Sequence, residues 1–285
     1  MAAVLAAAFW CLAAPPAALQ AQTQTAIDSL LSAAGVYLEQ LGRDLDGVVF
    51  EEDYFQQSVG QALLARRLKS DMAVLSDSAA GWVEFRDTTS VDGKPVVDRQ
   101  TRITDIFAHP SPNALEQARR VVREGARFNI SGVGFQINRT INLPMAALTF
   151  LRAVNQKRST FARDGVENVS GTRATIVTFV ETSKPRLIVT ADEAAANGAF
   201  WIDPASGRIL RTRLRLETRS GGSAAEAAIL VDYGFVSSLK LWLPKTMEDS
   251  YIARQRNDVV GSIQGSAAYD SFRKFNVAVE EKAGP

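Results

Sequence analysis

Apolar residues recur with a helical spacing near the start of the chain. Between residues 25 and 45 they stand three and four positions apart, which predicts an amphipathic helix with one buried stripe. Gly47 is expected to end this helix, because glycine readily adopts the conformation that follows a last helical turn. The stripe consists of Ile27, Leu30, Leu31, Ala34, Leu38 and Leu41.

From residue 48 onward the spacing changes to the period of two that marks β-strands. Residues 82–87 alternate between apolar and polar side chains and predict a half-buried strand, and the Asp92-Gly93 pair predicts a hairpin turn after it. Arginine and leucine alternate in residues 208–217, which predicts an antiparallel strand with one solvent face. Further strands are predicted at residues 63–70, 72–75, 96–106, 173–181, 186–190, 199–202, 227–235, 247–254 and 263–276.

Two further helices are predicted between these groups of strands. The first covers residues 111–128 and carries Arg119, Arg123 and Arg127 on one side, at successive spacings of four. The second covers residues 145–156 and is apolar almost all round. A helix of that kind is either buried on all sides or lies over an apolar cavity.

Strands that follow one another with short turns and few helices favour an α+β fold that is predominantly antiparallel β. A meander or an open barrel fits this order of elements better than a parallel sheet does. The chain has no internal repeat and no obvious linker, so residues 22–285 are expected to form a single β-rich domain.

Residues 1–21 have the composition of a secretory signal peptide. An alanine-rich apolar stretch leads to small residues around Ala21, after which cleavage is expected. The alternative is an uncleaved membrane anchor, but Pro15-Pro16 leaves an apolar run shorter than the roughly 20 residues of a spanning helix. Cys11 is the sole cysteine and lies in this segment, so the mature chain is expected to hold no disulfide. A periplasmic or extracellular protein without a membrane span follows from this interpretation.

The charge balance and the motif content argue against several classes of function. The chain has 32 Lys and Arg residues against 31 Asp and Glu, whereas nucleic-acid binding depends on an excess of cations. Neither a phosphate-binding Gly-x-x-x-x-Gly-Lys nor a dinucleotide-binding Gly-x-Gly-x-x-Gly is present. No cofactor is therefore expected, and a metal site would need mainly carboxylates, which is rare.

Catalytic chemistry has few candidates in this sequence. His109 is the only histidine, and no serine stands in a Gly-x-Ser-x-Gly turn that it would serve. The adjacent residues Glu51 and Glu52 are expected to point to opposite faces of a strand and to form no acid/base pair. No catalytic residue is therefore assigned, and a secreted hydrolase with a carboxylate or single-histidine site stays an alternative.

The order of elements also resembles a known group of proteins. An N-terminal amphipathic helix, strands, an apolar lid-like helix and a long run of antiparallel strands follow the signal peptide, and residues 200–210 contain an Asp-Pro-Ala-Ser-Gly turn. In these features the chain resembles the periplasmic lipoprotein-carrier superfamily of LolA, LolB and RseB type. Residues 241–247 and 268–275 are similar to segments of exported bacterial proteins. The resemblance implies a half-open β-barrel with an N-terminal helix and a helical lid, and an apolar cavity for lipid chains.

We therefore predict an exported, non-catalytic binding protein, either a carrier of lipid or lipoprotein acyl chains or an envelope sensor. Residues 145–154 would form the lid, and ordinary core packing is the simpler interpretation. A structural module whose exposed strand edges pair with an envelope protein is a further alternative. The arginine face of residues 111–128 would contact head groups or a partner, or else is merely solvated. The predicted ligand-binding residues are Met145, Leu148, Phe150, Leu151, Val154, Trp82 and Trp201, and the predicted head-group or partner contacts are Arg119, Arg123 and Arg127.

Overall fold

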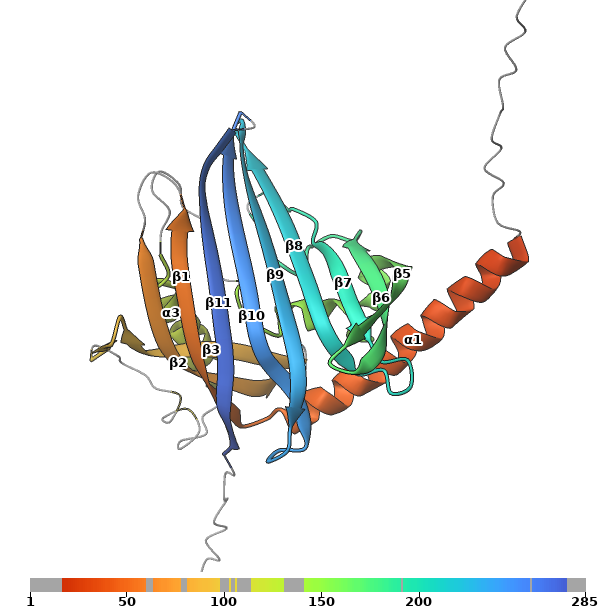
Figure 1. Cartoon of the computed structure of the whole chain (residues 1–285), viewed down its shortest axis with the longest axis horizontal. Coiled ribbons are helices and arrows are strands. Elements are labelled where there is room, and N and C mark those ends of the chain that lie inside the picture. The colour runs from red at the N-terminus through yellow and green to blue at the C-terminus, as the bar shows by residue number, and fades with distance from the viewer. Residues whose placement is uncertain are drawn as a thin grey trace, which may run out of the picture.

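The computed structural model describes residues 17–59, 64–77, 81–97, 103, 106, 114–130, 141–190, 192–256 and 258–275. The strands among them form one antiparallel sheet in the order β4-β3-β2-β1-β11-β10-β9-β8-β7-β6-β5 (Figure 1). The first group of strands is β1 (Val48–Val59), β2 (Ala65–Asp77), β3 (Gly81–Val91) and β4 (Lys94–Pro95). The second group is β5 (Ser159–Val169), β6 (Thr172–Glu181), β7 (Asn197–Ile202), β8 (Ile209–Ser220), β9 (Ser223–Val236), β10 (Leu241–Gln255) and β11 (Asp258–Lys274).

The two groups of strands are joined into one sheet by the pairing of β1 with β11. This pairing runs from Val48 opposite Lys274 to Val59 opposite Ser262, and within each group the strands pair in sequence order. Strands β4 and β5 lie at opposite edges of the sheet, which curls without closing (Figure 1). The predicted α+β, predominantly antiparallel fold with the form of a half-open barrel is therefore confirmed.

Helix α1 (Ala17–Asp44) crosses the open side of the sheet, where it contacts both β3 and β5. Its buried face is the predicted apolar stripe, with Leu30 only partly buried. Gly47 follows the helix with a φ of +75°, the left-handed conformation expected of a glycine at this place. The helix begins upstream of the predicted residue 25, so cleavage after Ala21, which stays a prediction, would fall in its first turns. No helix in the described part of the chain combines the length and the apolarity of a membrane span.

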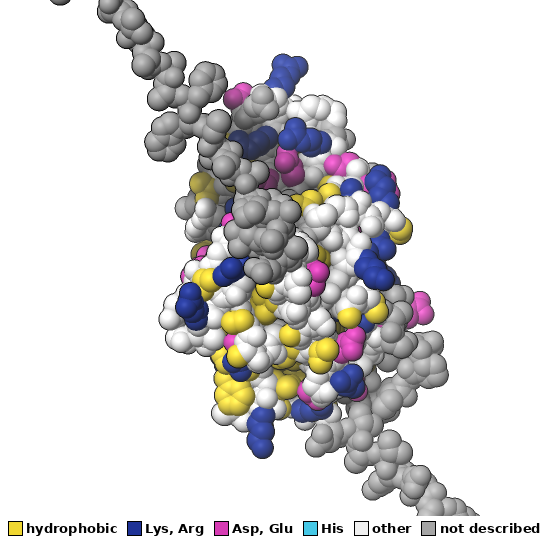
Figure 2. All heavy atoms as spheres, turned by 90° about the vertical axis from the view of Figure 1, so that its right-hand side faces the viewer, with side chains coloured by type: hydrophobic (Ala, Val, Ile, Leu, Met, Phe, Trp, Pro, Cys, Tyr) yellow, Lys and Arg dark blue, Asp and Glu magenta, His cyan; other side chains and the backbone are white. Residues whose placement is uncertain are grey.

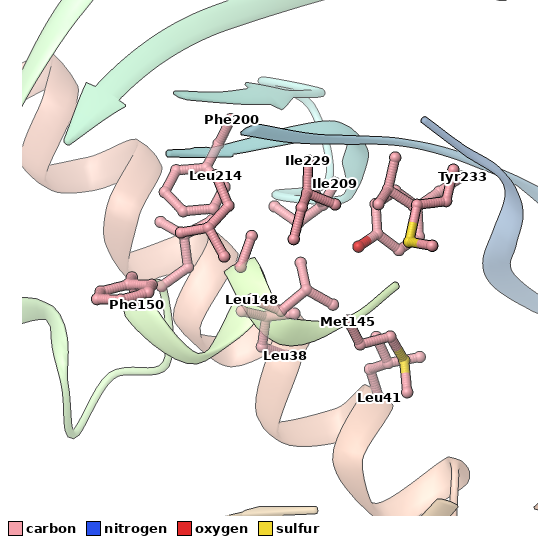
Figure 3. Close-up of a cluster of buried hydrophobic side chains, with 14 of the residues drawn as sticks. Leu38, Leu41, Met145, Leu148, Phe150, Phe200, Ile209, Leu214, Ile229 and Tyr233 are labelled. Carbon is pink, nitrogen blue, oxygen red and sulfur yellow. The ribbon is translucent and has the colours of Figure 1, made fainter. Parts of the chain in front are cut away.

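Residues 145–156 do not form the α-helix that was predicted for them. Their apolar part is a short 3₁₀-helix, η1 (Ala146–Phe150), which is followed by turns and by a second 3₁₀-helix, η2 (Gln156–Arg158). We call residues 141–158 the strap, because they cross between α1 and the sheet (Figure 3).

Local hydrogen bonds explain why the strap is not an α-helix. The amide of Leu148 bonds the carbonyl of Met145, three residues back, as in a 3₁₀ turn. The side-chain amide of Asn155 bonds the Thr149 carbonyl over 2.8 Å and takes up an acceptor that a continuing α-helix would use. Apolar composition therefore indicated the burial of Met145 to Leu151 but not the helix type, and Val154 is exposed.

The strands of the structure differ from the predicted ones in three places. Residues 63–70 and 72–75 were predicted as two strands, but β2 is a single strand that pairs with β1 without a break from Ala65 to Ala73. Residues 186–190 form bends and irregular backbone, not a strand. Strand β5 was missed, because most of its side chains are exposed and it lacks a buried apolar face. Most of residues 96–106 lie outside the described part of the chain.

Strand β3 was predicted to be half-buried but is covered on both faces. On one face, Phe85 packs in a small core against helix α3 (Ala114–Ala126), which confirms the predicted helix in this region. On the other face, Glu84 and Arg86 bond the strap. The main hydrophobic core fills this second, concave face of the sheet, where α1 and the strap pack on it.

A tight turn between β7 and β8 lies directly against α1. An added Cβ at Gly207, whose φ is +71°, would lie 2.5 Å from the backbone of Ala33. We expect Gly207→Ala to lower the free energy of unfolding by roughly 2–3 kcal/mol, because backbone strain and steric overlap act together. Gly93→Ala is the matched control, since Gly93 also has a positive φ but no atom within 4 Å, and should cost about 1 kcal/mol. Urea unfolding followed by tryptophan fluorescence measures both losses, and equal losses would contradict close packing of this turn on α1.

Candidate functional site

Four apolar side chains of the strap lie between α1 and the sheet. Met145, Leu148, Phe150 and Leu151 are at most 1% exposed and belong to the main core. The ring of Phe150 stacks on Phe179 of β6, with centroids 4.7 Å apart. Figure 3 shows the strap side chains among residues of α1 and of the strands, namely Leu38, Leu41, Phe200, Ile209, Leu214, Ile229 and Tyr233. The four predicted lid residues are thus gathered on the concave face, and their contact with a ligand stays a prediction.

The other predicted ligand-binding residues are distributed more widely. Trp82 is partly buried and packs at the margin of the main core, 5.8 Å from the Arg152 guanidinium. Val154 is 67% exposed. Trp201 follows the core residue Phe200 on β7 and so faces the outer side of the sheet, where it belongs to a separate small cluster. The structure therefore places Trp82 at the margin of the core that contains the lid residues, but it places Val154 at the surface and Trp201 on the outer face of the sheet.

The predicted arginine face lies on α3, away from the strap. Arg123 is exposed, and so is Arg127 just beyond the helix, where its guanidinium lies 4.8 Å from the centre of the Phe128 ring. The side chain of Arg119 and the whole of His109 lie outside what the structure describes. Contact of this face with head groups or with a partner stays a prediction.

A buried group of polar side chains, which we call the polar cluster, lies beside the apolar strap residues. Each member is at most 7% exposed. This cluster was not predicted, because the alternation in residues 82–87 indicated that the polar positions there face solvent. The cluster consists of Glu52, Tyr54, Glu84, Arg86, Asn142, Asp249 and Tyr269.

Arg86 is the centre of the polar cluster. Its Nε and Nη2 donate to the two carboxylate oxygens of Glu52 over 2.5 and 2.7 Å. Its Nη2 also donates to the backbone oxygen of Asn142 over 2.8 Å, and Nη1 donates to Asn142 Oδ1 over 3.3 Å. Burial opposes the charge on Arg86, but Glu52 outweighs this effect and holds the pKa of Arg86 above its ordinary value. One arginine thereby ties the sheet to the start of the strap.

Further sheet side chains hold the same end of the strap. Asn142 Nδ2 donates to the hydroxyl of Tyr54 over 3.3 Å, and that hydroxyl donates to Asp249 over 2.5 Å. The hydroxyl of Tyr233, on β9, donates to the Pro144 carbonyl over 2.7 Å. The strap therefore begins on a polar anchor and continues as an apolar segment.

Glu84 is the least satisfied member of the polar cluster. Its Oε2 accepts the Met145 amide over 3.1 Å, and its Oε1 has no hydrogen-bond partner among the described residues. Burial raises the pKa of Glu84 to about 8, although the Met145 amide and Arg86 act in the opposite direction. The carboxyl group is therefore mostly neutral at pH 7 while the strap is in place.

The polar cluster is structural in its bonding. Its hydrogen bonds link one sheet strand to another or to the strap, and within the described ranges no group of three or more His, Cys, Asp or Glu is placed to hold a metal ion. An open groove of about 520 Å³ lies on the outer face of the sheet, beside Phe55, Arg213 and Glu248.

Glu51 is exposed and Glu52 buried, which confirms that this adjacent pair points to opposite faces.

No protein-family model and no curated protein matches this chain. Among solved structures, a putative outer membrane lipoprotein-sorting protein domain from Vibrio parahaemolyticus is similar over 87% of this chain and 94% of its own, at 14% identity and a TM-score of 0.37. A DUF1329 family protein from Desulfovibrio piger is similar over 90% and 94%, at 11% identity and a TM-score of 0.38. A LolA superfamily protein from Nitrosomonas europaea is similar over 85% and 94%, at 8% identity and a TM-score of 0.29. At such low similarity no residue role is transferred from these structures to this chain.

Removal of Arg86 should destabilise the protein strongly. Arg86→Met leaves Glu52 as an unpaired buried charge, and we expect a loss of roughly 3–5 kcal/mol in the free energy of unfolding. The matched control is Arg67→Met, because Arg67 makes the same two-pronged contact with Asp53 at the surface, with side chains 63% and 32% exposed. That change should cost at most about 1 kcal/mol. If urea unfolding showed the same loss of stability in both variants, burial would not be what makes the contact of Arg86 with Glu52 important.

The stability of the fold should depend on pH through Glu84. A carboxyl group whose folded-state pKa is about 8, against an ordinary 4.5, stabilises the fold fully below pH 4.5 and loses that contribution as the pH rises toward 8. Glu84→Gln keeps an oxygen for the Met145 amide and does not titrate. Between pH 5 and 8, we expect the free energy of unfolding of the variant to rise relative to that of the wild type by up to about 1.4 kcal/mol per pH unit. Urea unfolding at a series of pH values tests this, and parallel profiles for the two proteins would refute it.

Proposed function

We propose that this chain is a non-catalytic envelope protein that holds an acyl chain of a lipid or lipoprotein on the concave face of its sheet, as a carrier or a sensor. The proposal rests on the way in which α1 and the strap cover the concave face of the sheet. The apolar floor of the half-open sheet is covered by α1 and by the strap, whose buried part is a short 3₁₀-helix and turns. An acyl chain would take the place of the strap side chains.

The hydrogen bonding of the strap supports such an exchange. Between residues 146 and 151 its backbone bonds are local, and no strand ladder among the described residues includes it. At its far end, the side-chain amide of Gln156 bonds the Leu31 carbonyl of α1 over 2.8 Å. Segments with few ladder bonds open at a lower free energy than the sheet they cover. Each buried ligand methylene would contribute about 0.8 kcal/mol to replacing the strap.

The place where the strap meets α1 also has apolar side chains at the surface. Val36 and Val154 are 66% and 67% exposed. They directly follow Gly35 of α1 and Ala153 of the strap, which lie against each other. Figure 2 looks at the side of the molecule where β5, β6 and α1 lie, and hydrophobic side chains are grouped there among charged ones. Such a rim suits the entry of an apolar ligand. Export by the segment at residues 1–21, to the periplasm or beyond the cell, belongs to the same proposal.

A disulfide between the strap and α1 tests the proposal. An added Cβ at Gly35 would lie 3.3 Å from the Cβ of Ala153, close to the distance across a disulfide. In a Cys11→Ser background, we expect the oxidised Gly35→Cys/Ala153→Cys protein to lose uptake of the uncharged fluorophore N-phenyl-1-naphthylamine. Reduction with dithiothreitol should restore the uptake, because the strap can then leave the sheet.

The two single-cysteine variants serve as controls and should keep uptake under the same oxidation. Mass spectrometry establishes whether the disulfide has formed. Undiminished uptake by the fully oxidised double variant would overturn the proposal that the strap gives way to the ligand.

A further inference from the structure

The polar cluster presents a fixed pattern of hydrogen-bond donors to the start of the strap. Arg86 donates to two oxygens of Asn142, the backbone carbonyl and the side-chain Oδ1. Both acceptors are carbonyl oxygens of uncharged amides. The hydroxyl of Tyr54 meanwhile accepts a bond from the Asn142 Nδ2 amide.

These donors cannot follow the strap when it leaves. Arg86 is held by both carboxylate oxygens of Glu52, and their side chains are 7% and 0% exposed. A purely apolar ligand on the concave face would therefore leave the Asn142-facing donors of Arg86 without acceptors, which costs free energy in a buried place. A ligand that carries a carbonyl oxygen at the head of its chain would replace the lost bonds.

The charges of the polar cluster decide what kind of oxygen is accepted. Glu52 already balances the charge of Arg86. The Asp249 carboxyl group bonds Tyr54 on the side of the cluster that meets Asn142. A free carboxylate or phosphate would bring a further negative charge into this desolvated place, whereas an uncharged carbonyl would not.

We propose that the polar cluster is the subsite for the ester or amide carbonyl at the head of an acyl chain, whose oxygen takes the place of the Asn142 oxygens on Arg86. The chain itself would continue over the positions of Met145 and Leu148, which follow Asn142 in the strap. An amide linkage would in addition offer its N–H to the hydroxyl of Tyr54. This inference rests on the proposed function, since it assumes that the strap gives way to an acyl chain.

Three ligands with the same sixteen-carbon chain test the subsite in the unaltered full-length protein. They are 1-palmitoylglycerol, which has an ester carbonyl, 1-O-hexadecylglycerol, its ether counterpart without the carbonyl, and palmitate, which is an anion. Each is titrated, below the concentration at which it forms micelles, against bound N-phenyl-1-naphthylamine. We expect the ester to bind at least tenfold more tightly than the ether, and palmitate to bind more weakly than the ester.

The double variant Glu52→Leu/Arg86→Met removes both charges together and leaves neither unpaired. Its ester and ether affinities should be equal, and its ether affinity should exceed that of the wild type, because no buried Arg86 donor is left without an acceptor. Equal binding of ester and ether by the wild type, tighter binding of palmitate, or an ester preference that survives in the variant would overturn the inference while leaving the proposed function in place. Binding of none of the three ligands would overturn the proposed function, and the inference with it. The wild-type comparison stands even if the double variant fails to fold.

Discussion

An antiparallel sheet that curls without closing must cover its apolar concave face with something other than more sheet, and the rest of this structure follows from that constraint. Strands β4 and β5 do not pair, so the two edges leave an open side. Helix α1 crosses this side and contacts β3 near one edge and β5 at the other. The strap completes the cover by placing apolar side chains between α1 and the strands, as Figure 3 shows. The pairing of β1 with β11 is what brings the two groups of strands into one surface for this cover.

The polar cluster determines where the cover is attached. A buried Arg86–Glu52 pair is weak evidence for stability in itself, because desolvation offsets much of the attraction between the charges. Its contribution here is positional, since Arg86 also bonds the backbone and the side chain of Asn142. Tyr233 and Glu84 bond the next part of the strap, at Pro144 and at the Met145 amide. Directional bonds thus set the start of the strap, while non-directional apolar contacts hold its middle.

Sequence patterns predicted much of the architecture, and the reasons for the misses are specific. The stripe of α1 and the alternation of β8 were identified because each presents one apolar and one polar face. Strand β5 was missed because its exposure leaves no such contrast. The strap was identified as buried but not as a 3₁₀ segment, since its conformation depends on bonds such as that between Asn155 and the Thr149 carbonyl. Trp201 was predicted to contact a ligand with the lid residues, but its place on the outer face depends on the register of β7.

The sequence by itself determined the class of fold and the absence of an obvious catalytic motif, because periodicity and composition are local properties of a chain. It also indicated that residues 145–154 are apolar enough to be enclosed. Only the tertiary structure decided that Glu84 and Arg86 lie inside, since their burial depends on the strap, which covers their face of β3. Glu52 and Tyr269, which are far apart in sequence, meet in the same cluster because β1 pairs with β11. A buried polar site formed across strands distant in sequence leaves no local pattern, because the side chains that satisfy each charge come from other strands and from the strap.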